Sequence, residues 1–161
     1  MFNTLQKFQK RVEELAARRF CRLQTIAPFV SFEDNCDADT VHIKIPDELY
    51  SSETHFDIDD IFTGRDRYLW LYKDVALPPA RHGFDVIGMF DFGKTGDGTN
   101  KGFESLLYVN GHPYQGVDTY HPDVVFNELS GRTVRLVFMM WTGLEGGGKP
   151  QKLRHLFRRA D

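Results

Sequence analysis

The dipeptide Asn110-Gly111 places the strongest constraint on what this chain can fold into. The β-prone residues 106–109 (LLYV) precede it, and His112-Pro113-Tyr114 follow it. Asn and Gly are the residues that tolerate a positive φ in the two-residue turn of a tight β-hairpin. The sequence therefore predicts an antiparallel hairpin across residues 106–114.

Other parts of the chain also have the residue types of strands. Residues 68–77 are β-prone and end at Pro78-Pro79, and residues 84–92, 104–109 and 132–141 form similar runs. An aromatic content of 14% suits pleated sheets, which accommodate flat rings well. Because turn signals separate these runs and no helical pattern intervenes, the 161 residues predict an all-β sandwich in one domain.

Both ends of the chain have apolar residues at helical spacing. One face of a predicted helix over residues 4–20 carries Leu5, Phe8, Val12 and Leu15. Near the other end, the start of a second helix, cut short at Asp161, is predicted by the spacing of Leu153, Leu156 and Phe157. We therefore divide the chain into a helix with its lead-in (1–24), a β-sandwich (25–150) and the start of a linker (151–161).

Charge and composition argue against several classes of protein. The net charge of −3 gives the molecule as a whole no electrostatic reason to bind nucleic acid. No apolar run approaches the roughly 20 residues of a membrane helix, and no signal peptide is recognisable. Cys21 and Cys36 have no zinc-binding spacing, so two reduced thiols in a cytoplasmic protein are expected.

Several motifs that carry chemistry are present only in part. Residues 143–149 (GLEGGGK) have the glycine spacing of a phosphate loop, but Pro150 replaces the Ser or Thr that would bind magnesium. The acids at 56–60 lack the Gly and the closing Glu of a calcium loop. The six His show no metal-site spacing, and no pair of carboxylates stands out for glycoside hydrolysis.

The segment 114–123 is the strongest candidate for a binding surface. It combines aromatic rings with polar side chains, which is how proteins hold sugars, since rings stack on C–H faces and polar groups bond to hydroxyls. The candidate residues are Tyr114, Gln115, Asp118, Tyr120 and His121. An equally good interpretation is that this segment packs against a neighbouring domain.

Four motifs, in a fixed order along the chain, carry a family resemblance. They are residues 64–71 (GRDRYLWL) with 75–78 (VALP), residues 104–113 (ESLLYVNGHP), residues 115–118 (QGVD), and residues 143–148 (GLEGGG) with 157–161 (FRRAD). Through them the chain resembles the N-terminal domain of α-mannosidases of glycoside hydrolase family 38, in the cytosolic and bacterial branch. The resemblance covers residues 60–161 well and the first 60 loosely.

The resemblance implies a jelly-roll, galactose-binding-like domain that precedes a metal-dependent retaining catalytic domain. In the family, His and Asp residues hold zinc and an Asp is the nucleophile. Those motifs would lie beyond Asp161, so none is carried over to this chain, which is expected to be inactive alone and to hold no cofactor. Its expected partners are its own catalytic domain and, through the whole enzyme, α-mannoside oligosaccharides.

Two alternatives stay open beside this interpretation. The chain can be a stand-alone carbohydrate-binding module that uses Tyr114 and Tyr120. It can also be a structural dimerisation domain that depends on the helix at 4–20, which would make it a homo-oligomer.

Overall fold

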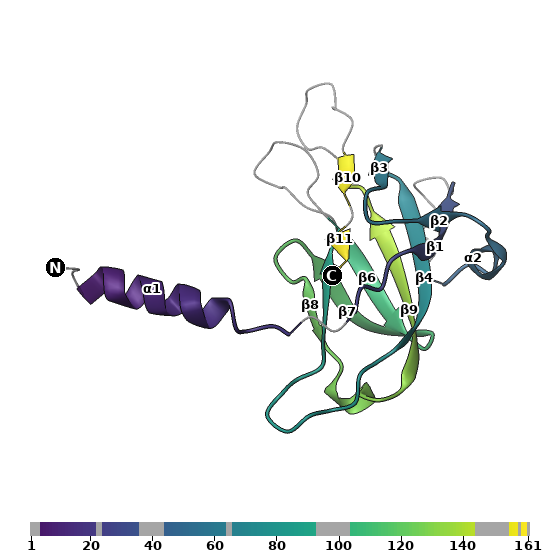
Figure 1. Cartoon of the computed structure of the whole chain (residues 1–161). Helices are drawn as coiled ribbons and strands as arrows, with labels where there is room; N and C mark the ends of the chain where they lie inside the picture. The colour runs from purple at the N-terminus through teal and green to yellow at the C-terminus, as the bar shows by residue number, and fades with distance from the viewer. Residues whose placement is uncertain are drawn as a thin grey trace, which may run out of the picture.

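The computed structural model of the chain describes residues 4–21, 24–35, 44–63, 66–92, 104–143, 155–157 and 159–160. The strands within these ranges pair antiparallel and form a six-stranded, a three-stranded and a two-stranded sheet (Figure 1). The predicted all-β class is therefore confirmed.

The large sheet has the strand order β2-β1-β4-β9-β6-β7. Its strands are β1 (Phe29–Asp34), β2 (His55–Phe56), β4 (Tyr68–Ala76), β6 (Glu104–Val109), β7 (His112–Asp118) and β9 (Thr133–Trp141). The predicted runs 68–77, 104–109 and 132–141 are thus β4, β6 and β9, with ends that differ by at most one residue. β4 and β9 pair along their full length, from Tyr68↔Trp141 to Ala76↔Thr133, and form the centre of the sheet.

The three-stranded sheet has the order β11-β5-β8. Its strands are β5 (Ile87–Asp91), β8 (Asp123–Val125) and β11 (Arg159–Ala160). β3 (Ile61–Thr63) pairs with β10 (His155–Phe157), and a 3-10 turn, η1 (Asn127–Leu129), follows β8. The strand predicted at 84–92 begins later, at Ile87, because Phe84 lies in a tight turn where Gly83 has a φ of +79°.

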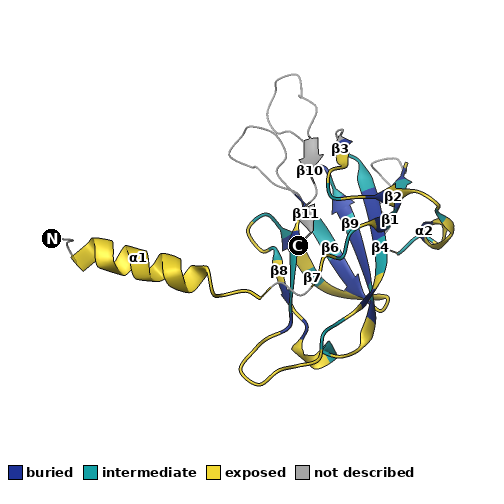
Figure 2. Ribbon diagram, viewed as in Figure 1, coloured by how far each residue is buried: buried dark blue, intermediate teal, exposed yellow. Residues whose placement is uncertain are grey.

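The main core lies between the large sheet and the three-stranded sheet (Figure 2). Alternate residues of β4 and β9 face it, among them Leu69 and Leu71 on β4. The Phe138 ring is at its centre, with centroids 4.7 Å from Phe90, 5.1 Å from Phe92 and 6.0 Å from Phe29. These aromatic contacts connect the two sheets.

The outer face of the large sheet carries a second apolar cluster. Trp70, Tyr108 and Val137 are buried there, although they alternate with the core-facing residues of the same strands. They are covered by a segment that contains the short helix α2 (Glu48–Ser51), whose Leu49 is fully buried. Figure 2 shows α2 beside β1 and β4 of the large sheet. Both faces of this sheet therefore carry an apolar cluster.

The predicted hairpin is confirmed as β6 and β7. Asn110 and Gly111 have φ values of +52° and +83°, as a two-residue hairpin turn requires. The Asn110 side chain also accepts a hydrogen bond of 2.9 Å from the backbone N–H of Arg135, which fixes the turn to β9. A register shift between Leu107 and Tyr108 gives the hairpin a β-bulge.

The predicted C-terminal helix is wrong. His155–Phe157 pairs with β3, and Arg159–Ala160 pairs with Phe90 and Asp91 of β5. A helix this short cannot offset the cost of its first turn, whereas a strand edge offers hydrogen-bond partners that are already in place. Near the end of the chain, β10 thus forms the two-stranded sheet with β3, and β11 adds a strand to the three-stranded sheet.

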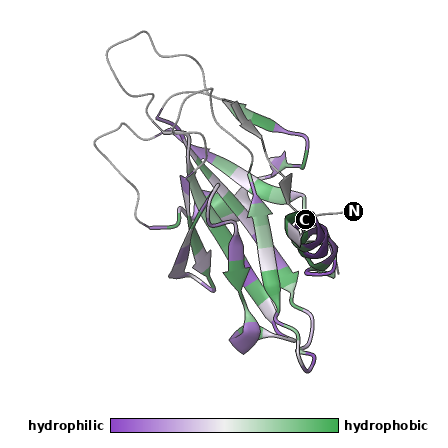
Figure 3. Cartoon of the chain, turned by 90° about the vertical axis from the view of Figure 1, so that its left-hand side faces the viewer, coloured by the Kyte–Doolittle hydropathy of each residue, from purple (hydrophilic) through white to green (hydrophobic). Residues whose placement is uncertain are grey.

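The predicted N-terminal helix is confirmed as α1 (Thr4–Ala16), which ends four residues earlier than expected. No residue of α1 is buried, and Figure 1 shows the helix extending away from the sheets. In Figure 3 green apolar segments lie along the strands, while α1 is largely purple. Its exposed apolar side chains are Leu5, Phe8, Val12 and Leu15.

Some sequence features lie outside the described residues. They are Cys36, most of the glycine-rich segment that resembles a phosphate loop (144–150) and part of the first motif of the family resemblance (Gly64 and Arg65). Among the helices that the structure describes, none has the length and apolarity needed to cross a membrane.

Candidate functional site

Tyr114 and Gln115 lie on β7 and connect it to β8. The Tyr114 hydroxyl donates a hydrogen bond of 2.9 Å to the Val125 carbonyl, and its ring stacks on Phe126 with a centroid distance of 5.8 Å. The Gln115 amide donates a bond of 3.0 Å to the Asp123 carbonyl. These two side chains join the edge of the large sheet to the three-stranded sheet.

Asp118 organises the turn that follows β7. Its Oδ1 accepts the backbone N–H groups of Tyr120 at 2.6 Å and of His121 at 2.8 Å, and His121 Nδ1 lies 3.1 Å away. Burial alone would raise the pKa of Asp118, but the hydrogen bonds from His121 and Tyr120 outweigh burial and lower it. Asp118 is therefore a carboxylate held in its charged form.

The structure brings the five predicted residues together along β7 and the following turn. The polar groups of Tyr114, Gln115 and Asp118 are directed to the chain itself. Tyr120 and the His121 side chain, both 73% exposed, are the most open to solvent, while Tyr114 is 45% exposed. The segment has a structural role, and a sugar platform there would rest on Tyr120 and His121.

A second group of polar side chains surrounds Arg135 on the outer face of the large sheet. Its guanidinium bonds to the Asp74 carboxylate at 2.9 and 3.0 Å and lies over the rings of Tyr50 and Tyr72. The Arg135 hydrogen bonds lower the pKa of Asp74 against the opposing effect of burial. Burial and the Asp74 carboxylate raise the pKa of Tyr72.

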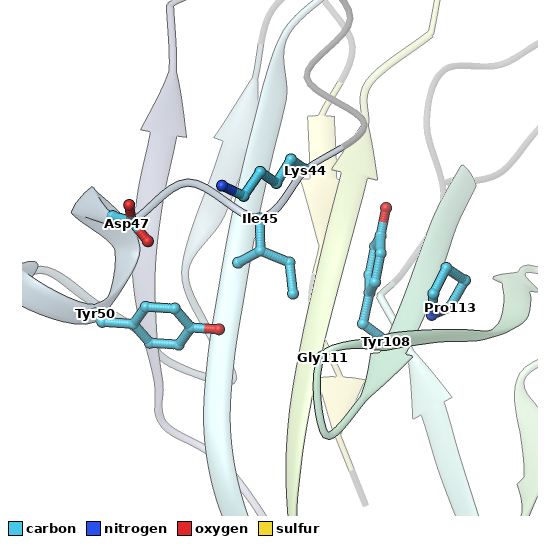
Figure 4. A pocket seen from close by; sticks show the side chains of 7 residues that line it. All are labelled: Lys44, Ile45, Asp47, Tyr50, Tyr108, Gly111 and Pro113. Carbon is cyan, nitrogen blue, oxygen red and sulfur yellow. The ribbon is translucent and has the colours of Figure 1, made fainter.

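Beside this group is a pocket of about 430 Å³ (Figure 4). The segment 44–50 forms one side of it, and the β6–β7 hairpin forms the other. The lining residues are Lys44, Ile45, Asp47, Tyr50, Tyr108, Gly111 and Pro113. Most of the lining is apolar, with a few charged or hydroxyl groups, as in small-molecule sites in general.

Sequence reasoning missed this pocket. Lys44 and Tyr50 are separated from Tyr108 by more than fifty residues, and only the sheet order brings them together. One signal was available in the sequence. Val137 and Met139 alternate with the core-facing residues of β9, so the side of that strand expected to face solvent is apolar. This pattern indicates that another segment of the chain covers it.

The described residues do not fit a metal centre. Within those ranges, no three His, Cys, Asp or Glu side chains are grouped so that they could hold a metal ion.

Comparison of the chain with protein-family models, with curated proteins and with solved structures identified no similar family, protein or structure.

Proposed function

We propose that this chain is a non-catalytic β-sandwich domain of a metal-dependent retaining α-mannosidase, with a jelly-roll topology. The proposal is based on the ordered motifs that resemble family 38 enzymes. Residues 68–71 lie on β4, residues 104–113 form the β6–β7 hairpin, and residues 115–118 complete β7. These three motifs therefore belong to the large sheet, where they would serve folding and contact with another domain.

Two carboxyl groups, Asp74 and Asp118, support the non-catalytic part of the proposal. A retaining glycosidase needs a general acid whose pKa is raised, about 5 Å from a second carboxylate. Asp74 and Asp118 have perturbed pKa values, and in both the pKa is lowered by hydrogen bonds. These two groups are unsuited to protonate a leaving group near neutral pH.

The exposed stripe on α1 favours a role in contact with another domain. Leu5, Phe8 and Val12 are each more than 60% exposed, although large apolar side chains in one row are normally covered. We infer that the catalytic domain of the parent enzyme covers this stripe.

The proposal is tested by comparing the 161-residue chain with the full-length protein. Each is incubated with an aryl α-mannoside and zinc. We expect turnover by the full-length protein only, lost on chelation and restored by zinc. Turnover by the 161-residue chain would contradict the proposal, as would a full-length protein with no H-x-D metal motif and no activity.

A further inference from the structure

Two opposite charges at the outer-face pocket are left without partners. Lys44 and Asp47 both line it, yet neither side chain forms a hydrogen bond or ion pair with another residue that the structure describes. Asp47 directly precedes α2, where an Asp usually accepts a backbone N–H, but its side chain makes no such bond. A free donor and a free acceptor are therefore available at the same opening.

Two tyrosines line opposite sides of the pocket, and Tyr50, which is 41% exposed, is the one whose ring a ligand would pack on, because Tyr108 is only 3% exposed. Figure 4 shows Tyr50 and Tyr108 on opposite sides of the pocket, with Ile45 between them and the Tyr50 hydroxyl pointing into the space. Tyr50 is held in place edge-on to Tyr72, with centroids 5.3 Å apart, and by the Arg135 guanidinium over its ring. Tyr108 is buried and belongs to the outer cluster. Both walls are thus fixed before any ligand binds.

We propose that this pocket binds one pyranose unit of a glycan. The C–H faces of a sugar ring pack on aromatic rings, and its hydroxyls both donate and accept hydrogen bonds. Asp47 can accept from a hydroxyl and Lys44 can donate to one. An anionic ligand would meet the Asp47 carboxylate and a cationic ligand the Lys44 ammonium, so a ligand without net charge, such as a polyol, suits this pair. This inference does not depend on the proposed hydrolytic parent.

The experiment is a titration of the 161-residue chain with methyl α-mannopyranoside and, separately, methyl α-glucopyranoside. Trp fluorescence follows binding, because the Trp70 ring lies 6.0 Å from the Tyr108 ring. We expect saturation with a Kd of about 1 mM, a common strength for a shallow site. Tyr50→Ala and Asp47→Ala should each weaken binding at least about tenfold. Tyr50→Phe, which keeps the ring, should weaken it less.

Tyr120→Ala is the matched control, because it makes the same change at an exposed tyrosine outside the pocket, in the 114–123 segment, where Tyr120 is 73% exposed against 41% for Tyr50. Thermal unfolding of every variant shows that the fold is retained. Binding lost in Tyr120→Ala and kept in Tyr50→Ala would overturn the proposal, and so would no saturation with either sugar up to about 10 mM. Saturation with the glucoside alone would support the pyranose site while counting against an α-mannosidase parent.

Discussion

Asp118 shows how a single carboxylate can give the stability of this domain a pH dependence. The pKa of Asp118 is lower in the folded chain than in the unfolded chain, where an aspartate has a pKa of about 3.9. Asp118 therefore stabilises the fold at pH values above about 3.9, and this stabilisation is lost as the pH falls through the lowered pKa. The variant Asp118→Asn keeps an acceptor oxygen but loses the charge. We expect it to reduce the free energy of unfolding at pH 7 by about 0.5–1 kcal/mol, a modest cost because the group is partly exposed.

The difference between wild type and Asp118→Asn should shrink as the pH is lowered below 4, and urea unfolding at pH 7, 5 and 3 measures it. Asp123→Asn, in the same segment, is the control and should change stability by less than about 0.5 kcal/mol at every pH. A constant difference across the three pH values would show that the Asp118 charge is not involved.

At the scale of one residue, the sequence showed which side chains are able to bind a ligand, but it did not show which of them bond to the chain itself. Tyr114, Gln115 and Asp118 were selected because their side chains are able to hold a ligand. The structure directs those groups to Val125, to Asp123 and to the turn after β7. The partners of Tyr114 and Gln115 lie in β8, which a single sequence does not place beside β7, so the role of these two side chains could not be predicted beforehand.

At the scale of the element, α1 makes a prediction about association in solution. Because its apolar stripe is uncovered, the isolated chain should self-associate as concentration rises, above the monomer mass of 18.6 kDa. The double variant Leu5→Lys with Phe8→Lys should remain a monomer in light scattering. Its unfolding temperature should match that of wild type, since no residue of α1 is buried.

A charge-matched control separates the stripe from a general effect of charge. Gln6→Lys with Glu13→Gln adds the same two positive units on the other side of α1 and should leave self-association intact. If both double variants dissociate equally, the stripe is not the contact surface.

Strands were easier to predict than the pocket or the chain end. β4, β6 and β9 are long or bounded by clear turn signals, so their local pattern is sufficient. β10 and β11 depend on free edges of β3 and β5, which are properties of the assembled fold. The pocket depends on the meeting of segment 44–50 with the β6–β7 hairpin, which also requires the sheet order.

At the scale of the whole molecule, Phe138 makes the connection between the two sheets. Its fully buried ring contacts Phe90 and Phe92 from the opposite side of the core. Phe138→Ala should lower the free energy of unfolding by about 3–5 kcal/mol through lost burial and the cavity it leaves. Phe84→Ala is the matched control, because the same change at a 68% exposed ring should cost less than about 1 kcal/mol. Equal losses in urea unfolding would contradict this account of the core.

The apolar character of both faces of the large sheet has a consequence for how its strands find their alignment. In a sheet with one solvent-exposed face, a register shift of one residue moves the core side chains to the solvent-exposed face and is strongly disfavoured. Here a slip of β6 would exchange Leu107 and Val109 for Leu106 and Tyr108, which are also apolar. Burial therefore discriminates weakly between the two alignments. The Asn110-Gly111 turn and its hydrogen bond to Arg135 therefore determine which of the two registers β6 adopts.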